Sequence, residues 1–327
     1  MGYKSSGGVD VKRHVPSRNP VFILGVPFPI CGWMRGRRFV EKYYKLSREK
    51  DSFLCVGLDP ATRAFRDKYV VPQPIIERYG VASGLEKFCI DFVEAVAPYT
   101  PIIKPNAQFL VYALGFNGLK AIVEAIHDGG CLGLLDCKLS DIGSTMDAGL
   151  HWIGELGFDA VTFSPFPGYE NGVDSVYRWA DEKEKGIFAL CRMSNPGTHD
   201  YQSRLMDGVP FYQRLAKDAT EHGSNGFVVG STATDEMGIV RSIIGEERLI
   251  LSPGLGAQGG DPAMTIKLGS NREGGGLLIS SSRSVNYAYE VMNWNWERFA
   301  EASAIQAKKS RDDLNDMRRR IKQSPLK

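Results

Sequence analysis

The sequence predicts an α/β fold with a single domain, a (β/α)8 barrel in which eight parallel strands alternate with helices. The chain has 327 residues and 43% of them are hydrophobic, so it can bury a large core in one barrel or in two smaller domains. Short apolar runs recur along the chain, and each is followed by a segment of helical length. Their hydrophobicity is continuous rather than alternating, which is typical of parallel strands buried on both faces.

Eight such runs in about 240 residues favour the barrel. A doubly wound open sheet is the alternative, but no GxGxxG motif opens a helix after an early strand. The expected strands are Phe53–Leu58, Pro101–Lys104, Cys131–Asp136, Ala160–Phe163, Gly186–Cys191, Gly226–Val229, Arg248–Ser252 and Gly276–Ser280.

Charge is nearly balanced along the chain. There are 40 basic and 38 acidic residues, which gives a formal net charge of +2 at pH 7. No field of one sign therefore recruits nucleic acid or an anionic membrane, and we expect neither as a partner. An anionic substrate has to be bound by a local group of charges.

Cysteines and histidines show no metal-binding or redox spacing. The six cysteines form no CxxC pair, and the five histidines form no HxH or HExxH pattern. Reduced cysteines are typical of a cytoplasmic protein, which is the location that we expect. We also expect no structural or catalytic metal.

Three segments are expected along the chain: an N-terminal extension over residues 1–45, the catalytic barrel over 46–300, and a polar, solvated C-terminal helix with a frayed tail over 301–327. Basic residues precede the apolar stretch Val21–Met34, an order that resembles a secretion signal. The stretch is too short to span a bilayer, and two prolines interrupt any helix there. We therefore expect an ordered extension.

Polar residues recur where the predicted strands end, which is where barrel enzymes carry their working groups. Each of these residues alone has an ordinary explanation, such as a surface ion pair or a solvated cap. Their convergence on one rim favours a site. The residues are Asp59, Lys104, Asn106, Asp136, Lys138, Asp141, Arg192, Ser194, Gln258 and Arg283.

Asp136 and Lys138 are two positions apart on a predicted strand, so both side chains are expected to point into the barrel mouth. Farther along, the glycine-rich segment Pro253–Gly260 and Arg283 follow the last two strands. Glycines let backbone N–H groups approach an anion, and a guanidinium can bind phosphate oxygens in pairs. A flexible loop and a solvated arginine are the alternatives, but together on adjacent strands the two features favour phosphate binding.

The motifs GLDP, KPN, DxKxxDIGST, SNPG and SPGxGAQGGDP, followed by a strand-8 Arg, occur in this order over roughly residues 50 to 290. This combination resembles orotidine 5′-phosphate decarboxylase. Related phosphosugar barrels share DxKxxD but not the GAQGGDP loop beside SNPG. One departure is Ser282, where many relatives have glycine before the strand-8 Arg, so a phosphate contact from that backbone N–H is less secure.

The resemblance implies a cofactor-free carboxy-lyase that converts orotidine 5′-phosphate to UMP in pyrimidine biosynthesis. It also implies a homodimer in which Asp141 and Thr145 serve the partner's site. Carried over by motif, the roles are ribose binding by Asp59 and Lys104 with Asn106 nearby, catalysis by Asp136, Lys138 and Asp141, completion of that array by Ile142 and Thr145, pyrimidine reading by Ser194, and phosphate binding by Gln258 and Arg283.

Such a reaction leaves electron density on a ring carbon. The Lys138 ammonium can stabilise that charge and supply the proton, while neighbouring carboxylates keep the amine protonated. One alternative is a metal-dependent barrel acting on a phosphorylated sugar, which chelators would inactivate. The other is a barrel that binds nucleotide without turnover, although a pure binder has no need of a lysine between carboxylates.

Overall fold

The computed structural model describes residues 22–23, 26–27, 35–254 and 259–323. The chain divides into two compact units, Met1–Trp33 and Met34–Lys327. Within the first unit, β1 (Phe22–Ile23) and β2 (Val26–Pro27) pair as antiparallel strands. The rest of the expected N-terminal extension up to residue 34 lies outside the described residues, and all that follows concerns the second unit.

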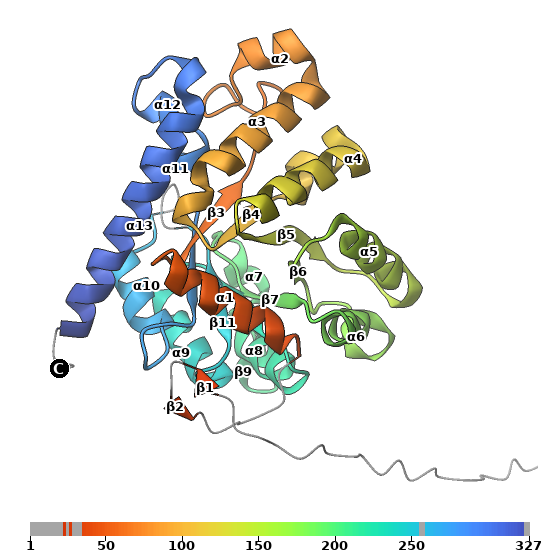
Figure 1. Ribbon diagram of the computed structural model, residues 1–327. Helices are drawn as coiled ribbons and strands as arrows, with labels where there is room; N and C mark the ends of the chain where they lie inside the picture. Colours follow the sequence, from red (N-terminus) through yellow and green to blue (C-terminus); the bar gives the residue numbers. More distant parts are fainter. Residues whose placement is uncertain (1–21, 24–25, 28–34, 255–258, 324–327) are drawn as a thin grey trace, which may run out of the picture. The chain divides into compact units, whose positions relative to one another are not determined.

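Eight parallel strands form a closed barrel, which confirms the predicted fold (Figure 1). Each strand pairs with the next along the chain, and the last pairs with the first, Ile279 lying opposite Leu54. All eight lie within three residues of their expected bounds. They are β3 (Leu54–Leu58), β4 (Ile102–Pro105), β5 (Leu132–Leu139), β6 (Ala160–Phe163), β7 (Gly186–Arg192), β10 (Gly226–Val229), β11 (Leu249–Ser252) and β12 (Leu277–Ser281).

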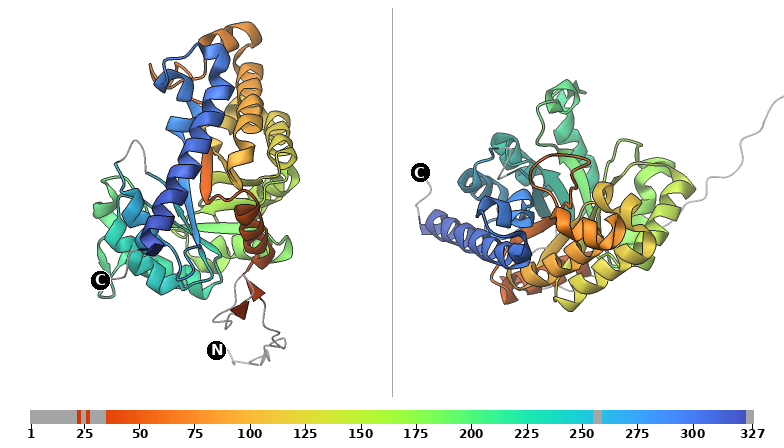
Figure 2. Two further views of the ribbon diagram at one scale, coloured as in Figure 1. Left: turned by 60° about the vertical axis from the view of Figure 1, so that its left-hand side comes forward. Right: turned by 90° about the horizontal axis from the view of Figure 1, so that it is seen from above.

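Helices surround the strands, as the view from above shows (Figure 2). The longer ones are α1 (Arg37–Glu49), α2 (Gln73–Tyr79), α3 (Val81–Val96), α4 (Ala107–Asp128), α5 (Gly143–Leu156), α6 (Asp174–Glu182), α8 (Phe211–Glu221), α9 (Thr234–Ile244), α10 (Pro262–Gly269) and α13 (Phe299–Gln323). Shorter elements are the one-turn helices α7 (Thr198–Tyr201), α11 (Arg283–Asn286) and α12 (Ala288–Val291), and the hairpin of β8 (Leu205–Met206) and β9 (Val209–Pro210).

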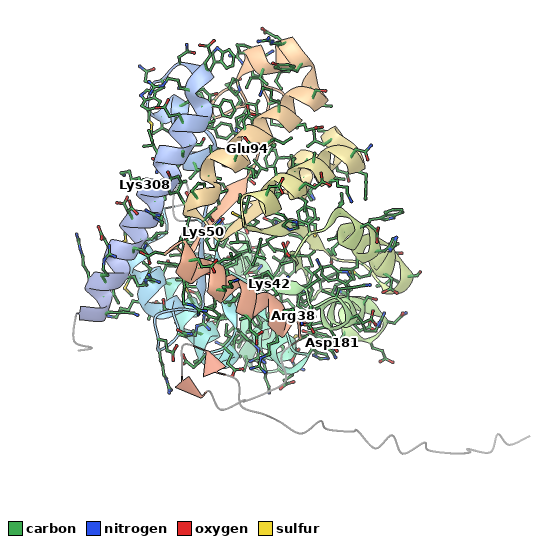
Figure 3. The ribbon with its side chains drawn as sticks, viewed as in Figure 1. Arg38, Lys42, Lys50, Glu94, Asp181 and Lys308 are labelled. Atoms are coloured by element: carbon green, nitrogen blue, oxygen red, sulfur yellow. The ribbon has the colours of Figure 1, made fainter. Side chains whose placement is uncertain are left out.

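Helix α1 closes the amino-terminal end of the barrel. Its Phe39 and Tyr43 are 1% exposed and belong to the same hydrophobic cluster as the inward-facing residues near the strand starts. The Phe39 ring meets that of Phe188 edge to face, with centroids 5.9 Å apart. Arg38 and Lys42 lie on the outer face of the helix (Figure 3). Because α1 plugs the amino-terminal end of the barrel, a binding site can form only at the carboxyl ends of the strands.

Two of the expected segments differ in the structure, one in its boundary and one in its burial. The limit at residue 45 falls inside α1, which is part of the compact unit. The C-terminal helix α13 is not merely solvated, because Ala302, Ala307 and Leu314 are buried in the main core. Asn315 is also buried, and its side-chain amide donates to the Asp51 carbonyl at 2.6 Å. Apolar positions spaced along a polar sequence produce this packing.

Within the described chain, one helix, α4, is long and apolar enough to cross a membrane by length and composition. Such a helix is weak evidence, since core helices of soluble proteins pass the same test. Here Leu119, Ile122 and Ile126 are buried in the core that surrounds the barrel strands. The described cysteines are free, and Cys55, Cys89, Cys131 and Cys191 are buried.

Candidate active site

A cavity of about 690 Å3 lies at the carboxyl ends of the strands, within the size range of small-molecule sites. It takes residues from β4, β5 and β12 and from the loops after β3 and β11. Five of the predicted site residues line it: Asp59, Lys104, Asn106, Asp136 and Arg283. Its other lining residues are Arg66, Tyr69, Phe109, Pro253, Gly254, Ser280, Ser281, Ser282, Ser284 and Val291.

At the base of the cavity, Asp136 bridges two lysines. Its Oδ2 lies 2.7 Å from Nζ of Lys104, and its Oδ1 lies 2.7 Å from Nζ of Lys138. The side chains of Lys104 and Asp136 are 7% and 13% exposed, whereas that of Lys138 is 38% exposed. The buried lysine therefore fixes the carboxylate, whereas Lys138 is more exposed and contacts the cavity through Asp136 without itself being one of the lining residues.

The electrostatics follow from this bridge. Burial raises the pKa of Asp136, but the ammonium groups of Lys104 and Lys138 lower it by more than burial raises it. The pKa of Asp136 therefore lies well below its usual range. Burial lowers the pKa of Lys104, and the carboxylates of Asp136 and Asp59 more than offset this, so its net pKa is raised. Asp136 and Lys104 are thus both charged at neutral pH.

Lys138 reaches Asp136 by a different route from the one predicted. Its φ is +51°, in the left-handed region, and the pairing of β5 with β6 shifts register between Leu135 and Leu139. Simple strand alternation therefore does not hold at this point, although Asp136 and Lys138 both lie on β5 and their side chains are in contact. The buried Thr162 of β6 holds the altered backbone, because its Oγ1 accepts from the Lys138 amide at 2.9 Å and donates to Oδ1 of Asp136 at 3.0 Å.

Asp59 is fixed by its backbone rather than by its carboxylate. Its amide donates to Oδ1 of Asn286 at 3.0 Å, and the Tyr287 hydroxyl donates to its carbonyl at 2.6 Å. Oδ1 of Asp59 is buried and has no hydrogen-bond partner among the residues that the structure describes. A buried acceptor of this kind is suited to a hydroxyl donor from a ligand.

Arg283 opens α11 at the rim of the cavity, and its guanidinium lies 5.9 Å from the centre of the Tyr69 ring. Gln258 falls in the segment 255–258, outside the described residues. Ser282 has φ −118°, which any L-residue adopts, so its backbone does not require glycine. Its hydroxyl has room because Gly57 stands opposite, where a Cβ would lie 1.9 Å from Oγ of Ser282.

The remaining predicted residues do not line the cavity of the single chain. Asp141, Ile142 and Thr145 are exposed at the amino-terminal end of α5, and Oδ1 of Asp141 accepts from the Ile142 amide at 2.8 Å. Ser194 follows β7 and packs against Gly230, where a Cβ would come within 2.7 Å of Cβ of Ser194. Arg192 is buried and pairs instead with Glu236 on α9 at 3.1 Å.

Sequence reasoning missed several residues of the site. Thr162 interrupts an otherwise apolar strand, which is a signal that could have been used. Arg66 and Tyr69 lie in the loop directly after the GLDP motif, but nothing in their spacing marks them. Asn286 and Tyr287 follow the strand-8 arginine and act through backbone groups of β3, a relation visible only in three dimensions.

Fold and cavity together define a (β/α)8-barrel enzyme with a charged site at the carboxyl ends of its strands. Residues 52–290 match the family described as orotidine 5′-phosphate decarboxylase / HUMPS family. A protein of Cupriavidus taiwanensis named orotidine 5′-phosphate decarboxylase is 35% identical over 287 residues, covering 86% of this chain and 98% of the relative. The chain belongs to this family.

Further comparisons agree. A protein of Cupriavidus metallidurans with the same name is 36% identical over 287 residues, again covering 86% of this chain and 98% of the relative. The structure of Leishmania donovani OMP decarboxylase has a TM-score of 0.67 at 27% identity, covering 84% of this chain and 98% of that one. Leishmania donovani UMP synthase gives 0.69 at 27% identity, and the match covers 84% of this chain but 56% of the synthase chain.

Proposed function

We propose that this chain decarboxylates orotidine 5′-phosphate to UMP without a cofactor, with Lys138 as the proton donor. The observation that carries the proposal is the Asp136 carboxylate held between Lys104 and Lys138 at 2.7 Å from each, inside a cavity of nucleotide size. Relatives of the same family named for this activity support it. The reaction belongs to de novo pyrimidine synthesis, for which a cytoplasmic location is expected.

The chemistry needs a positive charge beside the reacting carbon. When the bond to the carboxylate breaks, CO2 leaves and the electron pair stays on the ring carbon. The Lys138 ammonium stabilises that pair and then transfers a proton to it. Asp136 orients the Lys138 ammonium, and Lys104 helps to keep Asp136 ionised.

The rest of the substrate is assigned to the rim. Asp59 and Lys104 bind ribose hydroxyls with Asn106 nearby, Ser194 reads the pyrimidine, and Gln258 and Arg283 bind the phosphate. The unpartnered Oδ1 of Asp59 supports the ribose assignment, since a hydroxyl would supply the missing donor. Binding energy from the distant phosphate then contributes to the chemical step rather than to affinity alone.

We further propose a homodimer with shared sites, in which Asp141 and Thr145 complete the partner's array. In one chain the side chain of Ile142 is 56% exposed, and Trp152 on the same helix is 58% exposed. The Trp152 ring meets that of Phe116 on α4 with centroids 5.9 Å apart, so α4 and α5 carry exposed apolar side chains that a partner subunit could cover. A twofold-symmetric dimer formed through this surface would place these residues of each subunit in the site of its partner.

Subunit mixing tests the shared site. Lys138→Ala and Asp141→Ala proteins are each inactive under the proposal. If subunits reassort at random, about half of the dimers are mixed and each mixed dimer has one native site, so activity recovers to about a quarter of wild type. A mixture that stays inactive after exchange, confirmed by differently tagged subunits, would show that Asp141 serves its own chain.

The activity itself is tested by the loss of orotidine 5′-phosphate absorbance with purified protein in excess chelator. We expect full turnover under these conditions. The alternative within the same family is a metal-dependent enzyme acting on a phosphorylated sugar, and activity that disappears in chelator and returns with a divalent ion would favour it. UMP binding without CO2 release would instead indicate a nucleotide-binding protein.

A further inference from the structure

The loop between β3 and α2 forms one wall of the cavity. Arg66 and Tyr69 both line the cavity from this loop. Phe65, which is 66% exposed, contacts Phe109 at the start of α4 with ring centroids 6.0 Å apart. The loop therefore extends from the GLDP motif to a second lining residue, Phe109. Apart from Asp59 at its start, no residue of this loop has been assigned a substrate contact.

A carboxylate clamp fixes the shape of this loop. Tyr69 has φ +58°, a left-handed conformation that is unfavourable for a bulky side chain. Glu290 compensates, because its Oε2 accepts from the Tyr69 amide at 2.8 Å and its Oε1 accepts from the Val70 amide at 2.9 Å. Backbone strain held in this way is concentrated at ligand sites. The clamp directs the Tyr69 ring towards Arg283 and the Tyr69 carbonyl towards Arg66.

Arg66 is held in the cavity wall by two contacts. Its Nε–H donates to the Tyr69 carbonyl at 2.7 Å, and its guanidinium carbon lies 5.0 Å from the centre of the Tyr287 ring. The Tyr287 and Tyr69 rings lie 6.5 Å apart, and Arg283 lies over the far ring. Two guanidinium groups are thus placed on one pair of tyrosines, and the terminal nitrogens of Arg66 carry further N–H donors.

Neither of these two arginines forms an ion pair with another described residue. Among the residues that the structure describes, neither Arg66 nor Arg283 has a carboxylate oxygen within 4.0 Å of its side-chain nitrogens. The carboxylates of Asp59 and Asp136 also line the cavity but form no ion pair with either arginine, and the contacts that hold the two guanidinium groups are aromatic and backbone contacts. A dianion bound between them would provide a counter-ion.

We propose that Arg66 is a second phosphate-binding guanidinium, which contacts the phosphate of the nucleotide together with Arg283. This inference rests on the proposed function, since it assumes a nucleotide in this cavity. The phosphate dianion has more acceptor positions than one guanidinium can fill, and charge-assisted bonds to two arginines are stronger than bonds to one. Arg66 is then a binding residue supplied by a loop that carries no recognised phosphate motif.

Binding measurements separate this role from a purely structural one. Calorimetric titration with UMP and with uridine compares ligands that differ only in the phosphate. We expect Arg66→Ala to weaken UMP binding by about 10- to 100-fold and to leave uridine binding within about twofold. Arg66→Lys keeps the charge but not the paired geometry, and should give an intermediate loss for UMP. The matched control is Arg63→Ala, because Arg63 is exposed on the same loop and does not line the cavity.

Equal losses for UMP and uridine would overturn the proposal and make Arg66 a support for the loop. Unchanged UMP binding in Arg66→Ala would overturn it as well. If Arg66→Ala does not fold, Arg66→Lys gives the same comparison. Because the measurement needs no turnover, a wild-type protein that binds UMP without releasing CO2 would refute the proposed function while leaving the Arg66 comparison intact.

Discussion

Replacing Thr162 by valine removes a hydroxyl that joins the Asp136 carboxylate to the backbone of Lys138 while keeping the shape of the side chain. Thr162 is 1% exposed, and its hydroxyl makes one bond to Asp136 and one to the Lys138 amide. Losing a bond to a charged acceptor costs about 1.5–3 kcal/mol, and leaving the amide unpaired costs about 1–3 kcal/mol. The added methyl group returns about 1 kcal/mol, so we expect a net loss of about 1.5–5 kcal/mol in the free energy of unfolding.

The same change should lower kcat by about 10- to 100-fold, because Asp136 and the left-handed backbone at Lys138 lose their common support. Urea denaturation and steady-state kinetics measure the two effects. Thr162→Ser keeps the hydroxyl and should retain most activity. Thr265→Val is the matched control, because Oγ1 of Thr265 is buried without a hydrogen-bond partner in the described part of the chain. Wild-type kcat and stability in Thr162→Val would refute the reasoning.

Three further outcomes are expected. Lys138→Ala should abolish CO2 release and leave UMP binding within about tenfold, and near-normal turnover would contradict its role as proton donor. Arg283→Ala should lower kcat/KM for the nucleotide by more than about 100-fold yet barely change turnover of orotidine, whereas equal losses would mean that Arg283 supports the fold. Lys104→Met should cost about 3 kcal/mol of unfolding free energy between about pH 5 and 9, measured by denaturation at each pH.

The pH range in the last prediction follows from the directions of the two pKa shifts. The folded pKa of Lys104 is raised, so its contribution to stability is present below its unfolded value of about 10.4 and is lost as the pH rises through the folded value. The folded pKa of Asp136 is lowered, so its contribution is present above about pH 4 and is lost as the pH falls. A loss in Lys104→Met confined to one end of the pH scale would contradict the pairing.

Strand positions could be predicted from the sequence because parallel barrel strands are buried on both faces and leave continuous apolar runs. The ends of those runs located Asp59, Lys104 and Asp136, since the carboxyl ends of all strands meet at one rim. Periodicity could not show that Lys138 leaves the extended conformation, because the contact that its amide makes there is with a hydroxyl on the neighbouring strand. The position of the Lys138 ammonium depends on its contacts with Thr162 and Asp136.

Two other features depend on contacts between distant parts of the chain. The loop that carries Arg66 takes its shape from Glu290, which accepts from the Tyr69 amide and lies 221 positions from Tyr69 in the sequence. The plug helix α1 looks like a basic surface helix in the sequence, and its Phe39 is buried because Gly186 leaves room, where a Cβ would lie 2.6 Å from the ring. Neither relation leaves a local pattern.

The bonds from Asn286 and Tyr287 to the end of β3 also set the order in which the barrel can be completed. Asn286 is separated from Asp59 by 227 positions, and Ile279 pairs with Leu54 at the same seam. During synthesis from the amino terminus, β3 leaves the ribosome long before its second neighbour exists. Contacts at such sequence separation form late because they close the longest loops. The half of the cavity that contains Asp59 is therefore assembled only when the seam closes, and an unfinished or truncated barrel has no complete site with which to bind nucleotide.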